Sequence, residues 1–150
     1  MTTRRTFMLG GAMLAVPLPA LAQGPRPLLL MMSAEDCPPC NAWKMNVLPE
    51  WRKTDQFTRI DFKVIEGYRI RSLDNPGTWM TGKEYLPIYK AFLADVSRWT
   101  ASDKADVGFV NDHTAPRWFI VVDGKLQAVA VSWRRIATQL EDVLGLQPSK

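Results

Sequence analysis

The stretch SAEDCPPCNAWKMNVLPEW, residues 33–51, contains both cysteines of the chain. Cys37 and Cys40 are separated by two residues, and both of these are proline. Beyond them, apolar side chains recur at helical spacing, which predicts a helix that begins at Pro38. Proline is tolerated in the first turn of a helix, because the N–H groups there have no partner within the helix. Pro49, by contrast, is expected to kink this helix or to end it early.

An apolar run, PLLLMMS at residues 27–33, leads directly into the cysteine motif. A continuous run of this kind after a proline is typical of a strand that is buried on both faces. Met31 and Met32 are therefore expected in the core of the protein and not as metal ligands. Three tryptophans at helical spacing are expected in the same core, namely Trp43, Trp51 and Trp133.

Four further elements are predicted downstream of this helix. Residues 59–67 alternate apolar and polar side chains, which predicts a second strand that ends at Gly67. Apolar side chains at helical spacing predict an amphipathic helix over residues 85–96. Residues 117–133 predict a hairpin around Asp123 and Gly124. A closing helix is expected from residue 133 to 144, before a glycine at 145.

The first 22 residues carry the features of a secretory signal peptide. An arginine pair, Arg4 and Arg5, precedes an apolar run over residues 7–16 and the small-residue pattern at 20–22. A membrane-spanning helix needs about 20 apolar residues, and this run is shorter. Thr3 before the arginine pair and a phenylalanine after it favour the twin-arginine type, with an ordinary secretory signal as the alternative.

The predicted organisation is therefore a signal peptide at residues 1–22 and one folded domain at residues 23–150, located in the periplasm. Removal of the signal peptide leaves 17 basic and 15 acidic residues, so the formal charge falls from +4 to +2. Lysine and arginine are scattered along the chain, so neither a nucleic-acid partner nor a stable membrane attachment is expected. A chain of this length buries a core without disulfide staples, so the two cysteines are not needed to hold it together.

The order strand, helix, strand, helix, hairpin, helix resembles the thioredoxin fold over residues 27–146. The cysteine motif opens the first helix, and Thr114-Ala115-Pro116 stands just before the hairpin. The chain is most similar to exported thioredoxin-like reductases of the bacterial cell envelope. This resemblance implies an α/β fold with a central mixed sheet of about four strands flanked by helices. Residues 67–84 are longer than a minimal thioredoxin connection, and we expect them to form an insertion or an extended loop.

The resemblance also implies an enzyme, a thiol:disulfide oxidoreductase that reduces protein disulfides without a cofactor. In such a protein Cys37 attacks the client disulfide and Cys40 resolves the mixed disulfide. Pro116 completes the catalytic site through a cis bond after Ala115. Thr114 and Ala115 bind the backbone of the client as an added strand. The implied partners are a client protein with a disulfide or thiols and an upstream thiol–disulfide electron donor.

The residues around Cys37 predict its reactivity. Cys37 is expected at the exposed start of the helix, with Cys40 one turn inward, and a helix N-terminus favours a thiolate there. The two prolines carry no N–H, so only Cys40 and later amides can donate to that thiolate. Glu35 and Asp36 add negative charge, which disfavours it. Asp36 also stands where the family often has an aromatic residue, and Met31 where cytoplasmic thioredoxins have a buried acid. We expect a weakly acidified Cys37 and a reducing pair.

Two other functions for the cysteines stay open from the sequence. A structural disulfide is common in exported proteins, although closing so small a loop removes little chain entropy. A copper(I) site made of Cys37, Cys40 and His113 is the other alternative, in a copper-binding chaperone of the same fold. Trp79, in a turn-rich stretch, is expected either as an exposed partner contact or as a buried satellite of the core.

Overall fold

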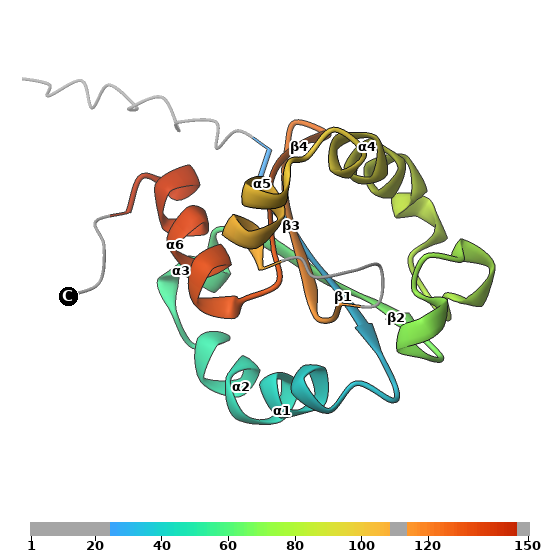
Figure 1. Cartoon of the computed structure of the whole chain (residues 1–150). Coiled ribbons are helices and arrows are strands. Elements are labelled where there is room, and N and C mark those ends of the chain that lie inside the picture. The colour runs from blue at the N-terminus through green and yellow to red at the C-terminus, as the bar shows by residue number, and fades with distance from the viewer. Residues whose placement is uncertain (1–24, 109–113, 147–150) are drawn as a thin grey trace, which may run out of the picture.

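A four-stranded mixed sheet runs through the middle of the molecule in a computed structural model, which describes residues 25–108 and 114–146 (Figure 1). The strand order is β2-β1-β3-β4. β1 (Leu28–Ala34) pairs in parallel with β2 (Asp61–Gly67) and antiparallel with β3 (Arg117–Val122). β4 (Lys125–Ala130) pairs antiparallel with β3 at the edge. The predicted α/β class with a mixed sheet of four strands is confirmed, and the arrangement is consistent with a thioredoxin-like one.

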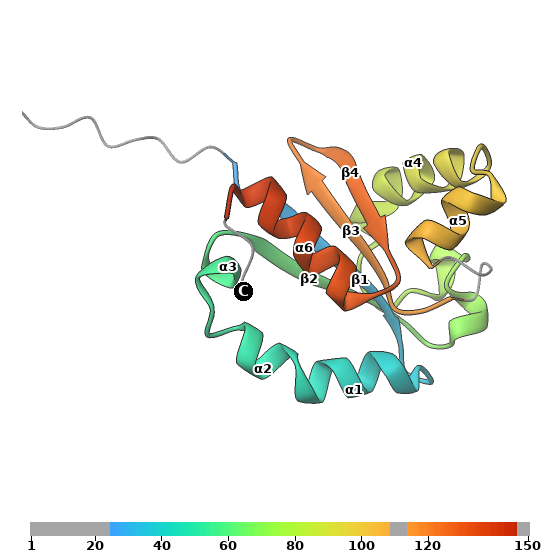
Figure 2. The same cartoon turned by 60° about the vertical axis from the view of Figure 1, so that its left-hand side comes forward.

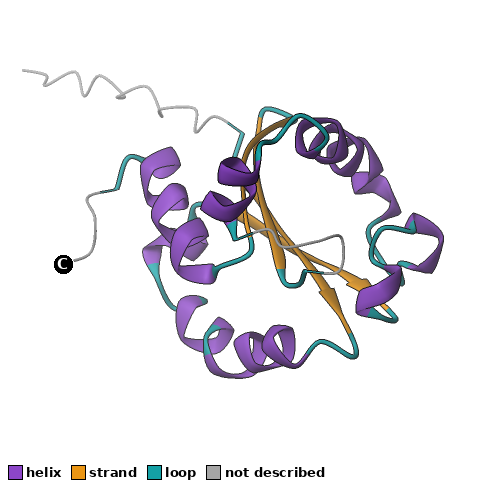
Figure 3. Ribbon diagram, in the orientation of Figure 1, coloured by secondary structure: helices purple, strands orange, loops and turns teal. Residues whose placement is uncertain are grey.

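Helices cover both faces of this sheet, as the two views in Figures 1 and 2 show and as Figure 3 shows by colour. On one face lie α1 (Pro38–Asn46), α2 (Leu48–Trp51) and α6 (Trp133–Leu144), and on the other lies α4 (Leu86–Val96). A short helix, α3 (Asp55–Thr58), leads into β2. The predicted effect of Pro49 is confirmed, because α1 ends before it and Pro49 stands in the first turn of α2.

The two faces of the sheet hold different aromatic clusters, because successive side chains of a strand point to opposite faces. Trp118 of β3 lies against α1 and α6, with its ring centroid 4.5 Å from that of Trp43 and 5.1 Å from that of Trp133. Phe119, the next residue, packs on α4, with its centroid 5.2 Å from that of Phe92. Met31 and Met32 are fully buried in β1, and Trp43 and Trp51 are also buried, as predicted, whereas Trp133 is partly buried and packs against this core.

The residues between β2 and α4, which the sequence predicts as an insertion or an extended loop, are folded into short turns. They fold into three 3-10 turns, η1 (Ile70–Ser72), η2 (Pro76–Thr78) and η3 (Lys83–Tyr85). Trp79 is 3% exposed and donates its indole N–H to the carbonyl oxygen of Leu73 at 2.9 Å. Trp79 is therefore a buried satellite of the core, and its alternative role as an exposed partner contact is wrong.

A short helix that the sequence did not reveal, α5 (Ala101–Val107), follows α4. Its residues have no apolar stripe, so hydrophobic periodicity does not predict it. It begins with a capping box in which the Thr100 hydroxyl accepts from the N–H of Asp103, and the Asp103 carboxylate accepts from the N–H of Thr100. Local capping, and not a buried face, accounts for this helix.

The predicted signal peptide and the predicted start of the mature chain at Gln23 lie outside the described residues. Within residues 25–108 and 114–146, no helix combines the length and the apolar character needed to cross a membrane.

Gly82 and Gly124 provide a matched test of the packing between the η3 turn and β2. Both have a positive φ, +89° and +74°. A Cβ at Gly82 would lie 2.8 Å from Cγ1 of Ile65, whereas a Cβ at Gly124 would meet nothing within 4 Å. We expect Gly124→Ala to lower the free energy of unfolding by about 1–2 kcal/mol through its backbone alone. Gly82→Ala is expected to lower it by about 1–3 kcal/mol more, because Ile65 must move.

Urea unfolding of the two variants measures this difference. Equal losses of unfolding free energy in Gly82→Ala and Gly124→Ala would contradict the close approach of Gly82 to Ile65.

Candidate functional site

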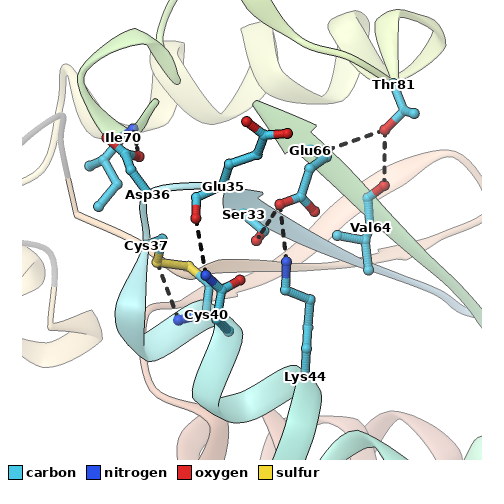
Figure 4. A network of polar contacts seen from close by, with 11 residues as sticks. Ser33, Glu35, Asp36, Cys37, Cys40, Lys44, Val64, Glu66, Ile70 and Thr81 are labelled. Carbon is cyan, nitrogen blue, oxygen red and sulfur yellow. Dashed lines mark hydrogen bonds and ion pairs between the residues drawn. A yellow bond between two sulfur atoms is a disulfide. The ribbon is translucent and has the colours of Figure 1, made fainter. Parts of the chain in front are cut away.

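The cysteine motif lies at the carboxyl end of β1, where the chain turns into α1 (Figure 4). Cys37 is the N-cap residue of α1, and Cys40 lies in its first turn. A disulfide joins them, with a distance of 5.3 Å between their Cα atoms, which is ordinary for a disulfide. The motif is therefore a C-x-x-C pair at the start of a helix, an arrangement compatible with a redox-active site.

A single backbone amide of the first turn donates a hydrogen bond to the Cys37 sulfur. The N–H of Cys40 donates to Sγ of Cys37, with the nitrogen 3.2 Å from the sulfur. Pro38 and Pro39 have no N–H to contribute, so this bond is among those that the sequence left possible, from Cys40 or a later amide. In the reduced protein the same amide would stabilise a Cys37 thiolate, together with the helix N-terminus.

The expectation that Cys37 is exposed is wrong. Both cysteines are 0% exposed, although the residues on either side of Cys37 are exposed. The Cys37 side chain is turned in over the first turn of α1, where its sulfur is bonded to Cys40 and accepts the Cys40 N–H. An external thiol or disulfide therefore reaches Sγ of Cys37 only after a local movement of the groups around it.

Charged side chains near the motif are paired with partners from β2 and the segment after it (Figure 4). Lys44 lies one helical turn beyond Cys40, and its Nζ is 3.0 Å from Oε1 of Glu66. The Ser33 hydroxyl donates to the same oxygen at 3.1 Å. Asp36 accepts the N–H of Ile70 at 2.7 Å. The charge of Lys44, the first cationic residue after the motif, is thus partly neutralised by Glu66. Lys44 therefore adds little to the stability of a Cys37 thiolate.

Glu66 is a residue that the sequence reasoning missed. The register of the parallel strands places Glu66 of β2 directly beside Ser33 of β1. This pairing joins residues 33 positions apart, and no local pattern reports it. The one sequence signal is the polar Ser33 at the end of an apolar run. If the two strands are assumed to be parallel neighbours, Ser33 is expected to have a polar partner on the second strand.

The residues before β3 reach the same end of the sheet as the cysteines. The Ala115–Pro116 bond is cis, as the resemblance implies. The β1–β3 register pairs Met32 with Arg117, so Pro116 stands beside the end of β1, from which the chain continues to Cys37. Thr114, Ala115 and Pro116 are each partly buried. The topology therefore brings the cysteine motif and the 114–116 loop to one end of the sheet.

Arg117 is the second residue that the sequence reasoning missed. Its side chain is 1% exposed, and its Nη1 lies 2.9 Å from Oδ1 of Asp74. Tyr89 donates its hydroxyl to the same carboxylate. Burial, followed by the hydrogen bond to Asp74, raises the pKa of Tyr89 above its ordinary value, so Tyr89 remains a neutral donor. An arginine at the start of an apolar strand is the one sequence signal for this buried pair.

A metal site receives no support from the described part of the chain. Among these residues, no group of three or more histidine, cysteine, aspartate or glutamate side chains is placed to hold a metal ion. His113, the third ligand of the copper alternative, lies outside the described residues.

No protein-family model, curated protein or solved structure matches the chain.

Proposed function

We propose that this protein is an exported, thioredoxin-like thiol:disulfide oxidoreductase that reduces protein disulfides through Cys37 and Cys40. The observation that carries the proposal is the C-x-x-C disulfide at the first turn of α1, at the end of the sheet that also carries the cis bond before Pro116. Export rests on residues 1–22, whose arginine pair and apolar run are those of a twin-arginine signal peptide, and it places the protein in the periplasm.

The proposed reaction is a pair of thiol–disulfide exchanges. In the reduced protein the Cys37 thiolate attacks one sulfur of the client disulfide, a bond forms between Cys37 and that sulfur, and the other client sulfur leaves as a thiolate. The Cys40 thiol then loses its proton and attacks Sγ of Cys37. The second client thiolate leaves, and the Cys37–Cys40 disulfide closes. Two electrons pass to the client, and its two thiolates take up protons.

The oxidised protein then needs a dithiol donor to restore its two thiols. An upstream thiol–disulfide protein is the proposed donor. The client is proposed to lie along the 114–116 loop, with its backbone paired to that of Ala115 and its disulfide facing Cys37.

The surroundings of Cys37 favour a reductase over an oxidase. A strongly oxidising disulfide requires a very stable thiolate in the reduced state. Here one amide donates to Sγ of Cys37, two prolines replace other donors, and Lys44 is paired with Glu66. The pair is therefore expected to resist reduction more than that of a strong periplasmic oxidase.

The reduction potential tests this direction. We predict a value near that of thioredoxin, about −270 mV, and far from the −120 mV or so of a strong periplasmic oxidase. Equilibration with glutathione buffers, followed by alkylation and mass spectrometry of the two thiols, measures it. A value above roughly −150 mV would contradict the reductase direction, and a value well below about −300 mV would indicate a structural disulfide.

A further inference from the structure

The segment between β2 and α4 is bonded to both halves of the candidate site. We call residues 68–82 of this segment the clamp. At one end, the N–H of Ile70 donates to Oδ1 of Asp36, the residue before Cys37. Farther along, Asp74 is paired with Arg117, the residue after Pro116. The clamp therefore contacts the chain next to the attacking cysteine and next to the cis-proline.

Arg117 bonds the clamp to the loop that precedes β3. Its Nε donates to the carbonyl oxygen of Thr114 at 2.9 Å, and its Nη1 donates to Oδ1 of Asp74 at the same distance. Nη1 also lies 3.2 Å from the hydroxyl of Tyr89, and the guanidinium lies 5.8 Å from the centre of the Phe92 ring. One planar group thus bonds to the backbone of Thr114 and joins the 114–116 loop to the clamp.

Hydrogen bonds to Asp74 itself and within the neighbouring turns hold Asp74 in place in the clamp. The Tyr89 hydroxyl donates to its carboxylate, and the indole of Trp79 donates to the carbonyl of the neighbouring Leu73. The hydroxyl of Thr78 donates to the carbonyl oxygen of Ser72 at 2.7 Å. Because the Arg117 charge is buried, it requires a counter-charge, and Asp74 supplies it from the clamp. The long segment between β2 and α4 thus supplies the counter-charge for Arg117.

We infer that Arg117 is a positioning residue: with Asp74 it holds Thr114, Ala115 and Pro116 in the conformation that pairs with an extended client backbone. The inference rests on the proposed function. Pairing with an added strand gains affinity when the receiving backbone is already ordered. A small disulfide needs no such pairing, since it reacts at the sulfur alone. Loss of the Arg117–Asp74 bond should therefore weaken binding of an extended client and spare the exchange chemistry.

Steady-state kinetics with two substrates separates these effects. One substrate is a peptide of about ten residues that carries a disulfide, and the other is the small aromatic disulfide 5,5′-dithiobis(2-nitrobenzoate). We expect Arg117→Met and Asp74→Asn each to raise KM for the peptide about tenfold, with kcat changed less than about threefold. The rate with the small disulfide and the reduction potential should equal those of the unchanged protein.

Asp95→Asn is the matched control, because it makes the same chemical change in an exposed ion pair, Asp95–Arg98. It should leave both substrates unaffected. Asp74→Asn keeps an oxygen that can accept from Tyr89, so it decides the question if Arg117→Met fails to fold.

The inference is overturned if Asp74→Asn leaves KM for the peptide unchanged, or if it slows both substrates equally, as a purely structural defect would. An unchanged protein that reduces neither substrate overturns the proposed function, and the inference with it. The behaviour of the unchanged protein therefore tells the two failures apart.

Discussion

We expect a Cys40→Ala variant to accumulate mixed disulfides between Cys37 and the proposed client proteins. The variant keeps the attacking thiol at the start of α1 and removes the thiol that would release the client. The second exchange is then impossible within the protein, so the intermediate persists until an external thiol cleaves it. Expression of the tagged variant in the periplasm, alkylation of free thiols and non-reducing electrophoresis reveal the complexes, and mass spectrometry identifies the clients.

Two controls make this trapping specific. Cys37→Ala and the double variant should trap nothing, because both lack the thiol proposed to attack the client disulfide, and Cys40 lies one turn farther inside the helix. Dithiothreitol should release every trapped client. If Cys40→Ala traps nothing while its Cys37 still reacts with an alkylating agent, Cys37 is not the attacking group.

Replacement of Trp118 by alanine is expected to cost more stability than any other change considered. Trp118 is 0% exposed in the centre of the sheet, and its ring packs against those of Trp43 and Trp133. Loss of a fully buried large aromatic side chain costs about 3–5 kcal/mol, from lost burial and from the cavity left behind. Since small domains are stable by about 5–15 kcal/mol, this is a large fraction of the total. Thermal and urea unfolding measure the loss.

Trp118→Phe is the conservative control. The indole nitrogen of Trp118 is buried without a hydrogen-bond partner among the described residues. Phenylalanine keeps an aromatic ring and removes this unpaired N–H, so we expect it to cost less than half of what alanine costs. A loss below about 1 kcal/mol in Trp118→Ala would contradict the packing of α1 and α6 on the sheet.

The sequence predicts the elements of this fold whose residues carry a clear period. The buried run at residues 27–33 forms β1, and the alternation at 59–67 forms β2. The Asp123-Gly124 turn joins β3 and β4, and both of its residues have a positive φ, as a two-residue hairpin of this composition requires. These elements follow from local chemistry, which a sequence displays directly.

The elements that the sequence did not predict depend on other kinds of interaction. The short helix α5 is stabilised by the capping box of Thr100 and Asp103, which leaves no trace in hydrophobic periodicity. The clamp is ordered by side chains that bond across it, such as Trp79 to Leu73. Hydrophobic periodicity does not record capping, and the turn-rich composition of the clamp does not record these cross-links.

The sequence predicted the cysteine pair of the candidate site from its spacing. It did not predict the burial of Cys37 or the residues that pair around the site. The two prolines predicted that only the amides of Cys40 and later residues can donate to Cys37, and the amide of Cys40 does so. The burial of Cys37 depends on the direction of its side chain, which tertiary packing decides. Arg117 and Asp74 are 43 positions apart, and only the folded chain shows that they form a pair.

Catalytic reduction of a peptide disulfide by the purified protein tests the redox role of Cys37 and Cys40 most directly. The assay supplies a dithiol donor in excess and follows the release of peptide thiols, for the unchanged protein and for Cys37→Ser. We predict many turnovers for each molecule of unchanged protein, and a rate at least about 10³-fold lower in Cys37→Ser, because the attacking thiolate is gone. If the two proteins reduce the peptide at the same rate, the Cys37–Cys40 pair is not a catalytic redox site.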